Sequence, residues 1–175
     1  MLQNNNNKPS VLILNISPDI SVKHIELDIG YQNIGSKIQL NLLSADSERT
    51  IISVTALDDF IQEHTIAQIM MLGRQIGAWA GLKSTIPNEG LNINHIHSSK
   101  INKHTKFYIL SDYEDCAMSI IDKYNTMFGT DFKVIAYTID EYSYFDVIVS
   151  KFSYEDFFYL GYALGWAYVF EDKLT

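Results

Sequence analysis

Short apolar runs and longer segments of helical period follow one another along the chain, which predicts a mixed α+β fold. The run VLILNI at 11–16 suits a buried strand. The alternating segments SKIQLNLL at 36–43 and TIISVTA at 50–56 flank the polar turn ADSER and predict an antiparallel hairpin. The proline-free segment from Leu57 to Leu82, with acidic residues in its first turn, predicts a long helix.

The second half of the chain repeats this order of elements. FYILS at 107–111 predicts a strand. The segment 112–129 predicts a helix, because it is acidic at its start and Gly129 stands at its end. The remaining predicted elements are two strands at 132–139 and 144–152 and a final helix, Tyr154–Phe170, capped by Ser153.

The two halves can be aligned, which predicts an internal duplication. LGRQIGAW at 72–79 and LGYALGW at 160–166 each contain Leu-Gly, a second glycine four residues later and then a Trp. The alignment assigns a helix to the ambiguous segment 18–34, because its counterpart is plainly helical. The alternative is coincidence in a chain rich in Ile, Leu and Gly. The predicted organisation is a disordered leader at 1–9 and a single compact domain at 10–175, made of two pseudo-repeated β-α-β-β-α units at 10–83 and 104–173 joined by a polar connector at 84–103.

Glycines inside the two long helices predict a close helix contact. Each interior glycine costs about 1 kcal/mol relative to alanine, so a compensating close approach is expected. We expect the helices to cross, or to pack on the sheet, through Gly-xxx-Gly faces. The alternative is that each glycine makes room for a neighbouring Trp or Tyr. These helix-packing residues are Gly73, Gly77, Gly81, Gly161 and Gly165.

Composition narrows the classes of partner. The net charge of −8 and the pI of about 4.9 argue against binding to nucleic acid, which requires clustered Lys and Arg. No uncharged apolar run reaches the roughly 18–20 residues of a membrane span, and the N-terminus lacks the apolar core of a signal peptide. Cys116 is the single cysteine, which fits a reducing compartment. We therefore expect a cytoplasmic protein with neither a nucleic-acid nor a membrane partner.

Catalytic signatures are absent from the sequence. It contains no P-loop, dinucleotide-binding fingerprint, nucleophile elbow or HExxH motif, so it favours a non-enzymatic protein and predicts no cofactor. His95 and His97 share one face of an extended segment, and with His104 they form a candidate metal site. The alternative is that these are ordinary surface histidines.

Tyrosines and acidic residues gather in the second half of the chain. Tyrosines beside acidic residues suit a protein interface, because the rings supply contact area and the hydroxyls supply hydrogen bonds. This pattern predicts a stoichiometric inhibitor, an immunity-type protein or a chaperone-like adaptor. Its partner would be a protein with a basic surface, or a second copy of the chain. The predicted binding residues are Asp140, Glu141, Tyr142, Tyr144, Tyr154 and Glu155.

The alternative function is a small-molecule-binding sensor with a ligand groove between the repeats, since the predicted units resemble the effector-binding domains of the gyrase-inhibitor-like fold in element order.

Overall fold

The protein has a mixed α+β fold, as predicted, with two three-stranded antiparallel sheets and three helices in the part of the chain that is described. The computed structural model describes residues 10–16, 38–45, 50–56, 63–83, 99–110, 114–139 and 143–174. The predicted leader at 1–9 and the predicted helix at 18–34 lie outside these ranges.

The first sheet is formed by β1 (Ser10–Ile16), β2 (Ile38–Ala45) and β3 (Thr50–Ala56). Its strand order is β1-β3-β2, with every pair antiparallel. The predicted hairpin is confirmed, because β2 and β3 pair with Ile38 opposite Ala56. Leu14, Ile52 and Val54 lie on one face of this sheet and are buried in the core.

The second sheet is formed by β4 (Ile101–Leu110), β5 (Lys133–Ile139) and β6 (Ser143–Phe152). Its order is β4-β6-β5, so the last strand is again central. Strand β4 begins six residues before the predicted start at Phe107. The last residues of the predicted connector, 101–103, therefore belong to this strand. The reason is that Thr105 continues the buried alternation of Phe107 and Ile109, although the residues around it are polar.

The helices are α2 (Glu63–Lys83), α3 (Glu114–Phe128) and α4 (Tyr154–Leu174). Residues 57–62 of the first long predicted helix lie outside the described residues. The end of α3 is as predicted: Gly129 has a φ of 65° and its N–H donates to the Asn125 carbonyl at 2.9 Å. Ser153 caps α4, and the Asp156 carboxylate accepts hydrogen bonds from the Ser153 backbone N–H and, at 2.9 Å, from its hydroxyl.

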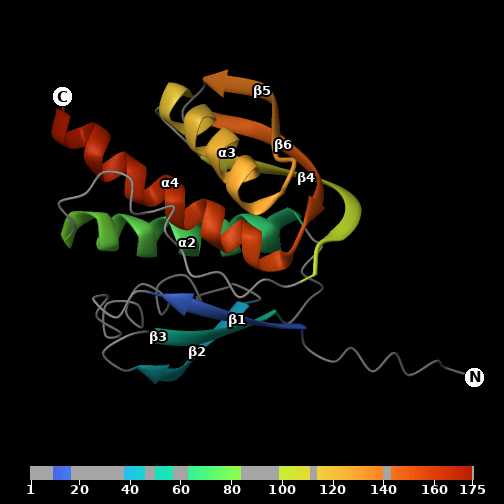
Figure 1. The fold of residues 1–175 in the computed structure, drawn as a ribbon, viewed down its shortest axis with the longest axis vertical. Helices are drawn as coiled ribbons and strands as arrows, with labels where there is room; N and C mark the ends of the chain where they lie inside the picture. The colour runs from blue at the N-terminus through green and yellow to red at the C-terminus, as the bar shows by residue number, and fades with distance from the viewer. Residues whose placement is uncertain are drawn as a thin grey trace, which may run out of the picture.

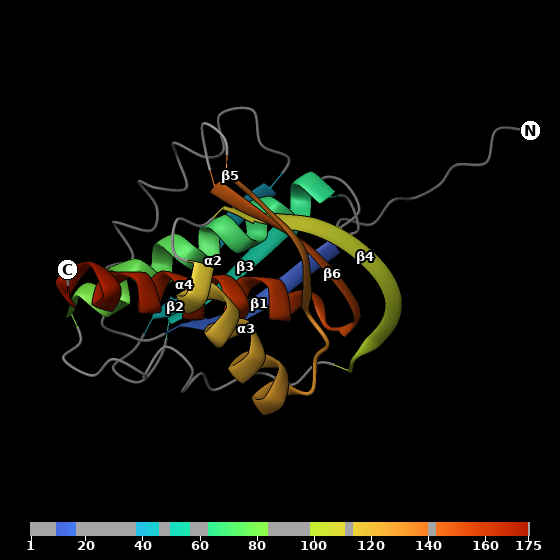
Figure 2. The same ribbon diagram turned by 90° about the horizontal axis from the view of Figure 1, so that it is seen from above.

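Helices α2 and α4 form a central layer between the two sheets (Figure 1). The sheet β1-β3-β2 lies on one side, and β4-β6-β5 lies on the other together with α3, which packs against α4. In the view turned by 90°, α2 and α4 again lie side by side (Figure 2). Both helices run in the same direction, since Gly73 of α2 meets Phe158 of α4 and Gly77, one turn later, meets Tyr162.

The turn before β5 is tied to β6 by Asp131. Its carboxylate accepts hydrogen bonds from the backbone N–H groups of Ser150 at 2.8 Å and Lys151 at 2.7 Å, and from the Ser150 hydroxyl. Partial burial raises the pKa of Asp131, but the bonds from the Ser150 hydroxyl and then from the two backbone N–H groups outweigh it, so the pKa lies below its ordinary value. The ionised form is therefore stabilised by folding.

Asp131→Asn should make the free energy of unfolding less sensitive to acid. Folding lowers the pKa of Asp131, so its ionised carboxylate stabilises the native state at pH values above the unfolded pKa of about 3.9. This stabilisation is lost as the pH falls through the folded pKa. Denaturant titrations at several pH values below about 5 should give a shallower loss for Asp131→Asn than for the wild type. Ser150→Ala keeps the two backbone donors and should be intermediate. Equal acid slopes for all three proteins would contradict this role.

Candidate functional site

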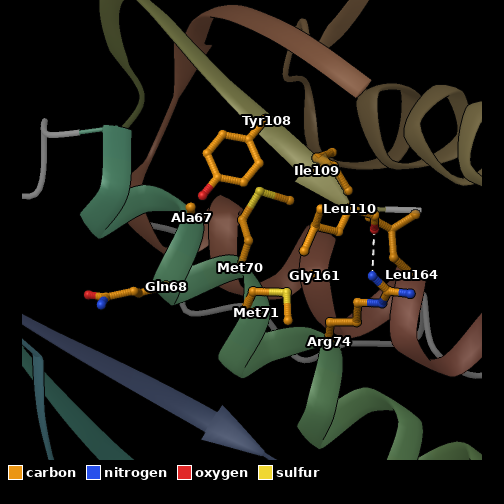
Figure 3. A pocket seen from close by; sticks show the side chains of 10 residues that line it. All are labelled: Ala67, Gln68, Met70, Met71, Arg74, Tyr108, Ile109, Leu110, Gly161 and Leu164. Carbon is orange, nitrogen blue, oxygen red and sulfur yellow. Dashed lines mark hydrogen bonds between the residues drawn. The ribbon is translucent and has the colours of Figure 1, made fainter. Parts of the chain in front are cut away.

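A cavity of about 330 Å³ lies where α2, β4 and α4 meet (Figure 3). Its volume is at the lower end of the roughly 300–1,000 Å³ that small-molecule pockets occupy. Helix α2 comes from the first half of the chain, and β4 and α4 from the second. The lining residues are Ala67, Gln68, Met70, Met71 and Arg74 of α2, Tyr108, Ile109 and Leu110 of β4, and Gly161 and Leu164 of α4.

The helical period of α2 aligns one wall of the cavity. Ala67, Met71 and Arg74 recur at spacings of four and three residues, which places them on one side of the helix. Methionine side chains are unbranched and polarisable, so they adapt to ligands of different shape. Gly161 of α4 adds no side chain to the cavity, and a Cβ there would overlap the Met70 carbonyl oxygen. The described part of the wall is therefore mostly apolar, and its residues carry a single formal charge.

That charge belongs to Arg74, whose guanidinium is held by two groups. Its Nη1 donates a hydrogen bond to the Leu110 carbonyl oxygen at 2.5 Å, drawn as a dashed line in Figure 3. Its Cζ lies 4.5 Å from the centroid of the Tyr168 ring, in a cation–π contact. Within the described ranges no carboxylate forms an ion pair with Arg74. An arginine carries five N–H donors, so the Leu110 bond uses one of them.

A second polar group lies at the other end of the row of lining side chains, where Figure 3 shows Gln68 pointing away from Arg74. The Gln68 Oε1 atom is buried and has no hydrogen-bond partner among the described residues. Thr65, one helical turn earlier, has a buried hydroxyl oxygen in the same condition. A buried acceptor without a donor costs free energy in the folded chain. Thr65 is not among the described lining residues and the Gln68 side chain points away from Arg74, so neither oxygen belongs to the Arg74 end of the cavity.

A separate polar cluster surrounds the buried Asp156 and is fully paired. Its carboxylate accepts hydrogen bonds from Lys100 Nζ at 2.8 and 2.7 Å, from the Tyr124 hydroxyl at 3.0 Å and from Ser153. Burial, followed by the charge of Asp156 and its hydrogen bond, raises the pKa of Tyr124 well above its ordinary value. The tyrosine therefore stays protonated at neutral pH. This cluster joins α3, α4 and the residue before β4, so it ties these three parts of the chain together.

Only part of the predicted acidic, tyrosine-rich surface lies among the residues that the structure describes. Asp140, Glu141 and Tyr142 lie outside the described residues. Tyr144 lies at the start of β6, whereas Tyr154 and Glu155 follow its end, and all three are half-buried. A ten-residue strand is roughly 33 Å long, so the structure does not bring Tyr144 together with the other two. Several other tyrosines of the second half are buried in the core, namely Tyr124, Tyr159, Tyr162 and Tyr168.

The predicted metal site also falls largely outside the described residues, because His95 and His97 are not among them. His104 is an exposed residue of β4. In the ranges that are described, no group of three His, Cys, Asp or Glu side chains could hold a metal ion.

Neither sequence nor structure comparison links the cavity to known proteins. No family model, curated protein or solved structure matches the chain. Among the helices that are described, none is both long and apolar enough to cross a membrane. Sequence reasoning predicted a ligand groove between the repeats only as an alternative and assigned no residues to it, so Arg74 was missed as a ligand-binding residue. The available signal was an arginine inside the glycine-containing face of α2, at the position where the aligned motif of α4 has Tyr162.

Proposed function

We propose that the protein is a small-molecule-binding sensor domain whose ligand occupies the cavity between the two halves of the chain. The observation that carries this proposal is the 330 Å³ cavity with walls from α2 of the first half and from β4 and α4 of the second. A ligand held by both halves is sensitive to their relative placement. Such a ligand shifts the population toward the arrangement that it binds more tightly, which is the physical basis of a sensor.

We also propose that the two halves are pseudo-repeated β-α-β-β-α units packed through Gly-xxx-Gly faces. Both sheets have the same antiparallel order, β1-β3-β2 and β4-β6-β5, which supports a duplicated unit. The helix contact is reciprocal at an offset of 88 residues. Cβ atoms at Gly73 and Gly77 would overlap the carbonyl oxygens of Phe158 and Tyr162, and those at Gly161 and Gly165 would overlap the carbonyl oxygens of Met70 and Arg74.

The proposed repeat also accounts for an open cavity on one side of the helix pair. The α4 residues that match Met70, Met71 and Arg74 at this offset are Phe158, Tyr159 and Tyr162. All three rings are buried in the core, at most 7% exposed. We infer that these larger rings fill the space that corresponds to the cavity. The smaller or more flexible side chains of α2 leave their side open.

The predicted protein-binding function, with its acidic and tyrosine-rich surface, stays a prediction. Half of its six residues lie outside the described ranges, and the others are split between the two ends of β6. The cavity is the feature that unites residues of both halves, so the proposal is built on it.

Filling the cavity should abolish the binding of a small apolar probe. We expect octan-1-ol to raise the melting temperature of the wild type, since a ligand at ten times its dissociation constant stabilises the native state by about 1.4 kcal/mol, or roughly 3–6 °C for a chain of this size. Met71→Trp places an indole in the cavity and should remove this rise, which differential scanning fluorimetry measures.

A matched control lies on the same helix. Leu82→Trp makes a similar change at a side chain that is 57% exposed and does not line the cavity, so it should keep the wild-type response. The proposal fails if none of octan-1-ol, octanoate, octylammonium and octyl phosphate stabilises the wild type, or if the rise is as large in Met71→Trp as in Leu82→Trp.

A further inference from the structure

We propose that the ligand of the cavity is a small organic acid, with an apolar body and a single carboxylate that pairs with Arg74. This inference rests on the proposed function, namely that the cavity holds a ligand. It adds the chemical class of that ligand, which follows from the charge, the wall and the position of Arg74.

The charge of Arg74 is the first step. A guanidinium stays protonated at all physiological pH values, and Arg74 is half-buried. Its two contacts within the described ranges, the Leu110 carbonyl oxygen and the Tyr168 ring, carry partial charges and do not neutralise it. A partly desolvated cation is stabilised most by a carboxylate, which can accept two parallel N–H hydrogen bonds from its planar fork.

The orientation of the guanidinium is the second step. The hydrogen bond to Leu110 fixes Nη1, and the Tyr168 ring at 4.5 Å restricts the rest of the group. An arginine fixed in advance loses little side-chain entropy when a ligand binds, so more of the contact energy appears as affinity. Because Arg74 is one of the lining residues, an anion that reaches it lies within the cavity.

The remaining wall defines the body of the ligand. Met70, Met71, Ile109 and Leu164 are apolar and line the same cavity. Its 330 Å³ equals the liquid volume of about eleven water molecules, so the body is an acyl chain or an aromatic ring of modest size. Apart from Gln68 and Tyr108 the described wall is apolar with one cation, and it fits a molecule of matching polarity.

A single negative charge fits better than a double one. The chain carries a net charge of −8, which repels anions in general, and Arg74 is the only Lys or Arg among the lining residues that the structure describes. One guanidinium balances one carboxylate, whereas a phosphate monoester would bring close to two charges. We therefore assign the ligand as a carboxylic acid rather than a phosphate ester.

The test compares four probes with the same eight-carbon chain: octanoate, octan-1-ol, octylammonium and octyl phosphate. Isothermal titration calorimetry on the full chain should give a dissociation constant for octanoate about tenfold or more below that for octan-1-ol, because one charged hydrogen-bonded contact is added. Octylammonium should bind more weakly than the alcohol, and octyl phosphate more weakly than octanoate.

Variants of Arg74 assign the preference to this residue. Arg74→Met removes the guanidinium and its charge and leaves an unbranched apolar side chain, so octanoate should bind about tenfold more weakly than to the wild type and lose its preference over octan-1-ol. Arg74→Lys keeps the charge and loses the planar fork, so it should retain part of the preference. Since the wild-type probe series decides by itself, the proposal stays testable if a variant does not fold.

The outcomes separate this inference from the proposed function. If octan-1-ol binds as tightly as octanoate, the carboxylate is refuted and the apolar cavity site stands. If octyl phosphate binds more tightly than octanoate, the single charge is refuted. If no probe binds, both the inference and the proposed function fail.

Discussion

Gly77→Ala should lower the free energy of unfolding by at least about 3 kcal/mol, or prevent folding altogether. A Cβ at Gly77 would overlap the Tyr162 carbonyl oxygen and lie 2.7 and 2.8 Å from the carbonyl carbon and Cα of Tyr162. These are backbone atoms of α4, so they cannot rotate away as a flexible side chain could. In an isolated helix the same substitution would be stabilising by up to about 1 kcal/mol, so the expected sign is opposite to that of helix propensity.

Chemical denaturation followed by circular dichroism measures this loss of stability. Alanine substitutions at three other glycines serve as comparisons. Gly165→Ala should match Gly77→Ala, because a Cβ there would meet the Arg74 backbone in the same way. Gly81→Ala should cost less, since its nearest neighbour is the Trp166 carbonyl oxygen at 3.1 Å. Gly129 has no atom within 4 Å of an added Cβ but has a φ of +65°, so Gly129→Ala should cost about 1 kcal/mol. Wild-type stability of Gly77→Ala would refute the close approach of α2 and α4.

Asp156→Ala should be the second large loss, about 3 kcal/mol. The carboxylate is fully buried and joins Lys100, Tyr124 and the cap residue Ser153. Its removal leaves the Tyr124 hydroxyl without its acceptor in the core and the helix without its capping partner. The Lys100 side chain is 23% exposed, so water can solvate its freed charge in part, and the estimate stays at the low end of the range for buried ion pairs.

A matched surface pair supplies the control. Asp146 forms an ion pair with Lys106 at 3.2 Å, but their side chains are 28% and 51% exposed, so Asp146→Ala should cost less than about 1 kcal/mol. A double-mutant cycle with Lys100→Met would separate the ion pair from the hydrogen bonds of Tyr124 and Ser153. If Asp156→Ala and Asp146→Ala cost the same, the buried cluster has no special role in stability.

Local patterns were sufficient for most of the described elements. Alternating apolar residues identified β2 and β3, and the cap residues Gly129 and Ser153 marked the end of α3 and the start of α4. These signals are local, because alternation, capping and turn chemistry depend on neighbours within a few residues. The start of β4 was predicted too late, because it depends on a distant residue: Ile101 pairs with Phe152, which lies far along the chain.

The candidate site could not be predicted from such patterns. Arg74 belongs to α2 and its hydrogen-bond acceptor Leu110 to β4, 36 residues later. The Tyr168 ring that covers it belongs to α4. Among the tyrosines that suggested a binding surface, Tyr159 and Tyr162 are core residues, because burial is decided by which helix faces meet.

The sequence by itself determined the α+β class, the antiparallel hairpin of β2 and β3 and the principal described strands and helices, because each depends on the period and end residues of one segment. Tertiary structure alone decided that α2 and α4 run in the same direction, that Gly77 meets the Tyr162 backbone, and that a cavity remains beside Arg74. Those features depend on the distance between surfaces of separate elements. That distance is set when the whole chain packs, and no single segment encodes it.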